Sequence, residues 1–223
     1  MADRLALTIA GEPMQLFADR ALYWPARKRL LIADLHLGKG DVFRAAGIAL
    51  PSGGTAHDLA RLSRLITASA AREVWVLGDL LHGATHHARW RDTWNPWREQ
   101  HAAIRFVALR GNHDRFRDAA ALDIEALGNA ESDTPFLLCH EPHPHPSLHV
   151  IAGHLHPVVK LPGLPRRMPA FWLREGITVL PAFSAFTGGY APAPIDGGRY
   201  AVCAEDHIAL VEVAWPGQTT RAR

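Results

Sequence analysis

Cysteine and long apolar runs are both scarce in this chain of 223 residues. Its 2 cysteines, Cys139 and Cys203, are too few for a disulfide framework, and neither belongs to a Cys-x-x-Cys pair. No apolar run approaches the ~20 residues that cross a bilayer, and the first residues lack the basic region and cleavage site of a secretory signal. We therefore expect a cytoplasmic protein that does not contact membranes.

A large excess of charge of one sign is also missing, since 24 Lys and Arg residues face 22 Asp and Glu residues. The resulting net charge of +2 does not by itself indicate a nucleic-acid-binding protein. An apolar fraction of 48% excludes an intrinsically disordered chain. Because we find no repeat and no linker, the length predicts a single domain over residues 1–223.

Short apolar runs that end abruptly in polar residues or glycine recur along the chain. Their composition and the turn residues around them predict buried strands over residues 29–33, 73–77, 104–110, 136–139 and 149–152. Residues 54–71 carry a leucine stripe that predicts a surface helix, and residues 86–103 should be helical in part, broken or restarted at Pro96. Short strands between Gly and Pro turns follow residue 156. This pattern predicts an α/β protein with two packed mixed β-sheets, a β-sandwich flanked by helices.

Polar side chains follow each of these five strands, namely Asp34, His36, Asp79, Asn112, His140, His154 and His156. Ligands collect beyond the carboxyl ends of strands in open α/β sheets, so we expect these side chains to meet. Alternate residues of an extended segment face the same way, which should bring Asp34 to His36 and His154 to His156. A set of carboxylates, imidazoles and an amide without thiolate favours Mn, Fe or Zn. Seven candidate ligands exceed one open coordination shell, which favours two ions.

The order of these motifs resembles the calcineurin-like metallophosphoesterase superfamily over about residues 30–157. The matching motifs are Asp-x-His at Asp34, Gly-Asp at Gly78, Gly-Asn-His-Asp at Gly111, a lone His140, and Gly-His-x-His at Gly153. The flanking segments 21–25, 33–39, 152–157 and 180–189 are similar to the bacterial ligase-associated DNA-damage-response endonucleases, and this narrower resemblance covers nearly the whole chain.

The resemblance implies a role for each matched residue. One ion would be held by Asp34, His36, Asp79 and His156, and the other by Asp79, Asn112, His140 and His154, with Asp79 shared. His113 matches the general acid, and Asp114 matches the residue that orients it. A hydroxide shared by the two ions would attack phosphorus in line, while His113 protonates the leaving alkoxide. Manganese is the expected ion, with iron and zinc as alternatives.

The resemblance therefore implies a phosphodiesterase, specifically a DNA endonuclease of DNA repair, with DNA as substrate and a DNA ligase and a helicase as candidate partners. An enzyme for a small phosphomonoester or a cyclic nucleotide would use the same site and stays an alternative. A non-catalytic scaffold is disfavoured because every ligand position is retained. A zinc-stabilised structural module is disfavoured because cysteine is so scarce.

Three further residues are candidates for contact with substrate. Arg110 and Arg115 flank the Gly-Asn-His-Asp turn, where they would stabilise phosphate charge unless they are ordinary surface arginines. His82 stands where many superfamily members carry Asp followed by Arg, and here Gly83 follows it. This departure argues against a protein Ser/Thr phosphatase. His82 would line the cleft or bond a metal ligand, with a structural role as the alternative.

Other residues with suggestive chemistry have simpler interpretations. Trp90, Trp94 and Trp97 alternate with arginine, as in single-strand binding surfaces, but their helical spacing favours core packing. Arg166 and Arg167 are better candidates for a phosphate contact on the surface. We expect a buried thiol at Cys139, on the face opposite His140. The remaining histidines singled out here are expected to be surface residues, namely His86, His87, His143 and His145.

Overall fold

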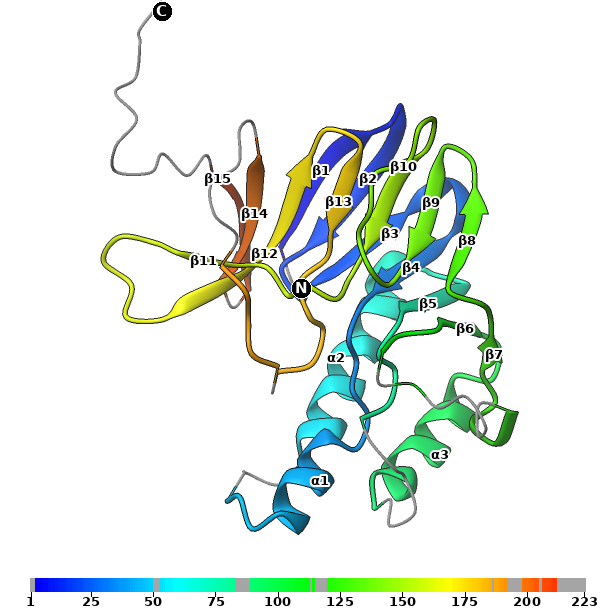
Figure 1. Ribbon diagram of the computed structural model, residues 1–223. Helices are drawn as coiled ribbons and strands as arrows, with labels where there is room; N and C mark the ends of the chain where they lie inside the picture. The colour runs from blue at the N-terminus through cyan, green and yellow to red at the C-terminus, as the bar shows by residue number, and fades with distance from the viewer. Residues whose placement is uncertain are drawn as a thin grey trace, which may run out of the picture.

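Two mixed β-sheets pack against each other in the computed structural model of the protein, and α-helices cover one side (Figure 1). The structure describes residues 3–49, 53–82, 89–112, 114, 120–185, 187–191, 198–204 and 206–211. This arrangement confirms the predicted α/β fold of two packed mixed sheets.

The first sheet has seven strands in the order of the chain. They are β1 (Arg4–Ile9), β2 (Glu12–Phe17), β3 (Ala21–Trp24), β4 (Arg29–Ile32), β5 (Glu73–Leu77), β6 (Arg105–Leu109) and β7 (Glu125–Ala126). The strands β1 to β4 form an antiparallel meander, and the strands β4 to β7 are parallel. The sequence analysis predicted the strands β4, β5 and β6 and assigned no structure to the meander that precedes them.

The second sheet has eight strands. They are β8 (Ala130–Asp133), β9 (Phe136–Cys139), β10 (His149–Ala152), β11 (Val158–Lys160), β12 (Arg167–Arg174), β13 (Ile177–Val179), β14 (Arg199–Ala204) and β15 (His207–Val211). Parallel pairing joins β10 to β9 and to β13, and the other strands pair antiparallel. The carboxyl ends of β9 and β10 therefore lie at one edge of this sheet, as those of β4, β5 and β6 do in the first.

Three α-helices occur among the described residues: α1 (Lys39–Ala45), α2 (Gly54–Ser69) and α3 (Trp90–Gln100). None of the described helices is long and apolar enough to span a membrane. The leucine stripe of α2 is buried against the first sheet, as predicted. Pro96 lies inside α3 without breaking it, so the predicted interruption is wrong. Burial of Trp94 and Trp97 on either side of this proline holds the helix together and outweighs the hydrogen bond that proline removes.

The tryptophans of α3 belong to the core. Trp94 is fully buried, and its indole Nε1 donates a hydrogen bond to the Leu122 carbonyl at 3.2 Å. Trp97 Nε1 donates to Ser63 Oγ of α2 at 2.8 Å. The core interpretation of these side chains is therefore confirmed, and they offer no surface on which bases could stack.

A second apolar layer fills the space between the sheets. Leu31 and Val107 of the first sheet belong to the same apolar cluster as Phe136, Ile151 and Phe171 of the second. All five residues are fully buried. This layer fixes the two sheets face to face, and it thereby sets the distance between the polar loops at their shared edge.

Candidate metal centre

The loops that follow β4 and β5 are joined by backbone hydrogen bonds. The Asp34 amide donates to the Gly78 carbonyl at 3.2 Å, and the His36 amide donates to the Asp79 carbonyl at 2.9 Å. From the second sheet, the His154 amide donates to Asp34 Oδ2 at 3.1 Å. Residues from both sheets therefore converge on one place, where the carboxyl ends of the parallel strands meet.

The backbone at five of the predicted ligands is left-handed. Asp34, His36, Asp79, His154 and His156 have φ angles of 55°, 48°, 50°, 67° and 46°. The expectation that these residues alternate along extended segments is therefore wrong, because a left-handed residue turns the chain sharply. Such conformations disfavour side chains with a Cβ, and they cluster at functional sites, where the surrounding structure enforces them.

One group of potential ligands consists of Asp34, His36 and His156, whose ligand atoms all lie within 4.8 Å of one another. His156 Nε2 lies 3.1 Å from Asp34 Oδ1. The other ring nitrogen of His156, Nδ1, lies 3.1 Å from the Gly188 carbonyl. A carbonyl only accepts hydrogen bonds, so Nδ1 carries the proton of the neutral ring and Nε2 presents its lone pair to the carboxylate.

A second group consists of Asp34, Asp79 and His140, with ligand atoms also within 4.8 Å. His140 Nε2 lies 3.6 Å from Asp79 Oδ1 and 3.2 Å from His154 Nδ1. His140 Nδ1 lies 2.9 Å from the Leu77 carbonyl, which again directs the Nε2 lone pair into the site. His154 therefore lies beside the second group, whereas His156 belongs to the first.

This arrangement fits divalent metal ions. Asp34 is 0% exposed, and its Oδ1 accepts no hydrogen bond within the part of the chain that the structure describes. Imidazole lone pairs and carboxylate oxygens facing each other repel unless a cation lies between them. Imidazole nitrogen with carboxylate oxygen is the donor set of Mn, Fe and Zn sites. The candidate Asp and His metal sites predicted from the sequence are therefore present as two adjacent groups.

Asn112 lies beside the second group, at the end of β6. Its side-chain amide donates a hydrogen bond to Glu141 Oε1 at 2.8 Å, which leaves the amide oxygen as the atom for a metal ion. The pKa of Glu141 lies below its ordinary value, first because Asn112 donates to it and next because His154 is close. Glu141 was not among the predicted site residues, although it directly follows the predicted ligand His140.

The catalytic prediction concerns His113 and Asp114. His113 and Arg115 lie outside the described residues, so their roles stay predictions. The Asp114 carboxylate accepts hydrogen bonds from the backbone amides of Leu81 and Gly111, both at 2.9 Å. Burial raises the pKa of Asp114 above its ordinary value, although these two hydrogen bonds oppose the shift. The Asp114 carboxylate thus connects the loop after β5 to the loop after β6.

The other two predicted substrate residues lie on opposite sides of the site. Arg110 is exposed and lines an open cavity of about 370 Å³ together with Asn112, His140 and Glu141. The His82 ring lies 5.2 Å from the His36 ring in an edge-to-face contact. The two rings are in contact, and the role of His82 stays a prediction.

Two glycines allow the loops to approach each other. A Cβ on Gly78 would overlap the His140 ring, and a Cβ on Gly111 would overlap the backbone nitrogen and Oδ1 of Asp79. Both glycines precede predicted ligands in the motifs, but their packing role was not predicted. Lys39 was missed as well. Its Nζ donates to Thr187 Oγ1 at 3.4 Å, and burial lowers its pKa in spite of the nearby Asp34 and Asp79.

The residues with simpler interpretations behave as expected where they are described. His143 is exposed and His145 is half-buried, and each bonds backbone atoms within its own loop. Cys139 is buried in the apolar layer of the second sheet, and burial raises the pKa of its thiol to about 11. His86 and His87 lie outside the described residues.

Comparison with known proteins agrees with this geometry. The calcineurin-like phosphoesterase family model matches residues 27–136. The crystal structure of the nuclease MPE from Pseudomonas putida is 36% identical and has a TM-score of 0.83, over 94% of this chain and 100% of that one. The chain therefore belongs to the calcineurin-like phosphoesterase family, and it is a metal-dependent phosphoesterase.

More distant structures were also found. The phosphoesterase Yfce from E. coli is 17% identical over 82% of this chain and 97% of that one, with a TM-score of 0.46. The protein AQ665 of unknown function from Aquifex aeolicus is 16% identical over 57% of this chain and 78% of that one, with a TM-score of 0.41. No curated protein matches the chain.

Proposed function

We propose that this protein is a DNA endonuclease that hydrolyses internal phosphodiester bonds, with two divalent metal ions, during DNA repair. The observation that carries this proposal is the convergence of Asp34, Asp79 and four histidines from both sheets on one buried edge. The similarity to a Pseudomonas nuclease over nearly the whole chain favours DNA over a small ester. The role in repair, with a DNA ligase and a helicase as partners, is supported by the motif resemblance.

Asp34, His36, Asp79 and His156 would hold one ion, and Asp79, Asn112, His140 and His154 would hold the other. The residue common to both groups of close ligand atoms is Asp34. That Asp79 is the residue shared by the two ions is part of the proposal. Manganese is the proposed ion, with iron and zinc as alternatives, because carboxylate and amide oxygens combine with imidazole nitrogens and no thiolate. Bound ions would activate a water molecule and neutralise the charge that develops on phosphorus.

The protein's own residues would then orient the substrate and move one proton. His113 would protonate the leaving oxygen, since histidine is the side chain that most often serves as a general acid. Asp114 would hold His113 in place through the loop that it already ties to Leu81. Arg110 and Arg115 would stabilise the negative charge of the phosphate beside this turn, in part through the open cavity that Arg110 lines.

The test is nicking of circular DNA, which has no ends and therefore reports only endonuclease activity. Wild type should nick single-stranded circles and hydrolyse a bis-aryl phosphodiester when Mn²⁺ is added. Asp79→Ala should abolish both activities, whereas Asp92→Ala, which changes an exposed carboxylate on α3, should keep both. Equal activity of wild type and Asp79→Ala would refute the metal site. Ester hydrolysis without nicking, at low and at moderate salt, would refute the DNA assignment and leave the small-ester alternative.

His113→Ala separates the proposed acid from a structural residue. The loss of a general acid costs about 10²–10⁴ in rate, and the cost is greatest when the leaving group is a poor one. We therefore expect His113→Ala to lose DNA nicking far more than hydrolysis of the bis-aryl ester. An equal loss on both substrates would contradict the acid role.

A further inference from the structure

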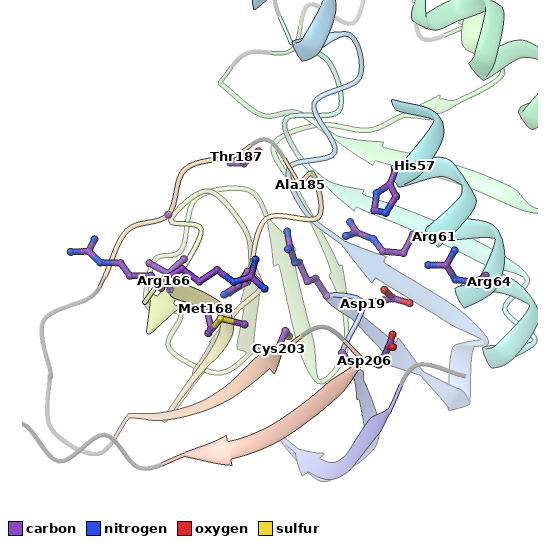
Figure 2. A pocket seen from close by; sticks show the side chains of 16 residues that line it. Asp19, His57, Arg61, Arg64, Arg166, Met168, Ala185, Thr187, Cys203 and Asp206 are labelled. Carbon is purple, nitrogen blue, oxygen red and sulfur yellow. The ribbon is translucent and has the colours of Figure 1, made fainter. Parts of the chain in front are cut away.

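A second cavity lies beside the metal centre and is not used by any of the roles above (Figure 2). Its volume is about 530 Å³. His57, Arg61 and Arg64 of α2 lie on one side of the cavity, and Arg166, which precedes β12, faces them from the other side. Ala185, Thr187, Gly189 and the turn before β3 complete the wall.

The wall of this cavity is strongly cationic. It contains five arginines (Arg20, Arg61, Arg64, Arg166 and Arg167) and two carboxylates (Asp19 and Asp206). Burial lowers the pKa of Arg61 to about 10, which still leaves its guanidinium charged at neutral pH. Burial also raises the pKa of Asp19 above its ordinary value. An excess of guanidinium groups in a concave surface selects for anions with several oxygens, such as phosphate.

Among the described residues, the Arg61 guanidinium has a buried donor without an acceptor. The residue is 5% exposed, and within the described part of the chain its Nε donates no hydrogen bond. Its NH2 group donates to the Phe183 carbonyl and lies 3.4 Å from Asp58 Oδ1. A buried guanidinium that lacks one acceptor is costly, and the negative charge of an anion in the cavity would stabilise it.

One segment of chain separates this cavity from the metal centre. The Ser184 amide donates to the Asp34 carbonyl at 3.2 Å, while the Ser184 carbonyl accepts from Arg20 at 3.3 Å. Further along the chain, the Gly188 carbonyl bonds Nδ1 of the predicted ligand His156, and its neighbour Gly189 lines the cavity. Thr187 lines the cavity and also accepts a hydrogen bond from Lys39. The two sites are therefore neighbours, and Ser184, Thr187, Gly188 and Gly189 lie between them.

We propose that this cavity binds a backbone phosphate of the same DNA strand whose scissile phosphate lies at the metal centre. The inference rests on the proposed function, and it deepens that function by assigning a second contact that only a polynucleotide can make. Arg64 and Arg166 are exposed and face the cavity from opposite sides, so they are the residues that bind a phosphate arriving from solvent. Arg20 donates to the Ser184 carbonyl, Arg61 donates to the adjacent Phe183 carbonyl, and both complete the positive wall.

Equilibrium binding of a fluorescent single-stranded oligodeoxynucleotide tests this proposal. All proteins carry Asp79→Ala, so that no cleavage occurs during the titration. Arg64→Ala/Arg166→Ala should bind at least tenfold more weakly, and the slope of log K against log salt should become shallower by about 0.7, because one phosphate contact is lost. The matched control Arg72→Ala/Arg199→Ala removes two exposed arginines beside the amino ends of β5 and β14 and should change affinity less than twofold.

The remaining arms separate a strand phosphate from free phosphate. Inorganic phosphate at millimolar concentration should compete weakly with the oligonucleotide for the Asp79→Ala protein. Equal losses in the cavity variant and the control would overturn the proposal. Loss of inorganic phosphate binding with unchanged oligonucleotide binding would also overturn it. Failure of wild type to nick DNA would refute the proposed function, whereas the binding contrast would still decide whether the cavity holds a strand.

Discussion

Single residues of the metal centre adopt conformations that they would avoid elsewhere. Ten described residues other than glycine have a positive φ, and five of them are predicted metal ligands. Each such residue costs roughly 1–2 kcal/mol relative to an ordinary conformation. The backbone hydrogen bonds between Asp34 and Gly78, and between His36 and Asp79, hold the turns in place. These hydrogen bonds therefore fix the turns that orient the predicted ligands.

Gly111 tests whether this geometry depends on the close approach of the loops. A methyl group at Gly111 would overlap the backbone nitrogen and Oδ1 of Asp79, so Gly111→Ala must displace that carboxylate. We expect Gly111→Ala to reduce manganese-dependent hydrolysis of a bis-aryl phosphodiester by 100-fold or more. Gly128→Ala is the matched control, because a Cβ there meets no atom within 4 Å. Similar steady-state rates for the two variants would contradict this account.

At the scale of elements, the sequence predicted most of the strands that carry the site. The runs that became β4, β5, β6, β9 and β10 are buried along almost their whole length, so their uniform apolar composition identifies them. The strands β1 and β2 have mixed burial and lie toward the edge of the first sheet, so their weaker pattern went unassigned. The convergence of the ligands followed from strand direction alone.

The details of the loops could not be read from the sequence. Alternation predicted that His154 and His156 share a face, but their backbones are left-handed, and His156 belongs to the first group of ligands while His154 lies beside the second. Such turns are set by hydrogen bonds to residues far away in the chain, as between the His154 amide and Asp34. Pro96 likewise stays inside α3 because tertiary burial of neighbouring tryptophans overrides its local preference.

Asp133 links the two sheets and should make stability depend on acid. Its carboxylate accepts hydrogen bonds from Arg27 Nε at 3.0 Å and from Arg29 NH1 of β4 at 2.9 Å. These partners, Arg27 first, hold the pKa of Asp133 below its ordinary value of 3.8. A lowered pKa in the folded state contributes stability that is full above pH 3.8 and is lost as the pH falls further.

We therefore expect Asp133→Asn to lower the free energy of unfolding at pH 7 and to lose less stability than wild type between pH 4 and pH 3. Urea unfolding at a series of pH values, with chelator present, measures both effects. Asp92→Asn removes an exposed carboxylate from α3 and should follow the wild-type curve. Parallel curves for wild type and Asp133→Asn would show that the link between the sheets adds no acid-sensitive stability.

At the scale of the whole molecule, the metal centre joins the two sheets. Asp34 and Asp79 follow strands of the first sheet, while His140 and His154 follow strands of the second. Between them, the apolar layer that contains Leu31 and Phe136 already holds the sheets together. Ions bound at the edge would add a second connection between the same halves. Metal binding and global stability should therefore be coupled.

Removal and return of metal test this coupling. A ligand that binds only the folded state at about 100 times its Kd stabilises it by about 2.7 kcal/mol, which for a domain of this size raises Tm by roughly 5–11 °C. We expect saturating Mn²⁺ to raise the Tm of chelator-treated wild type by this amount, with two ions bound per chain by elemental analysis. Asp79→Ala should lose most of the rise, because its carboxylate belongs to both proposed ion sites, whereas Asp92→Ala should keep it. A Tm that does not change when Mn²⁺ is added would show that a shared ion does not stabilise the contact between the two sheets.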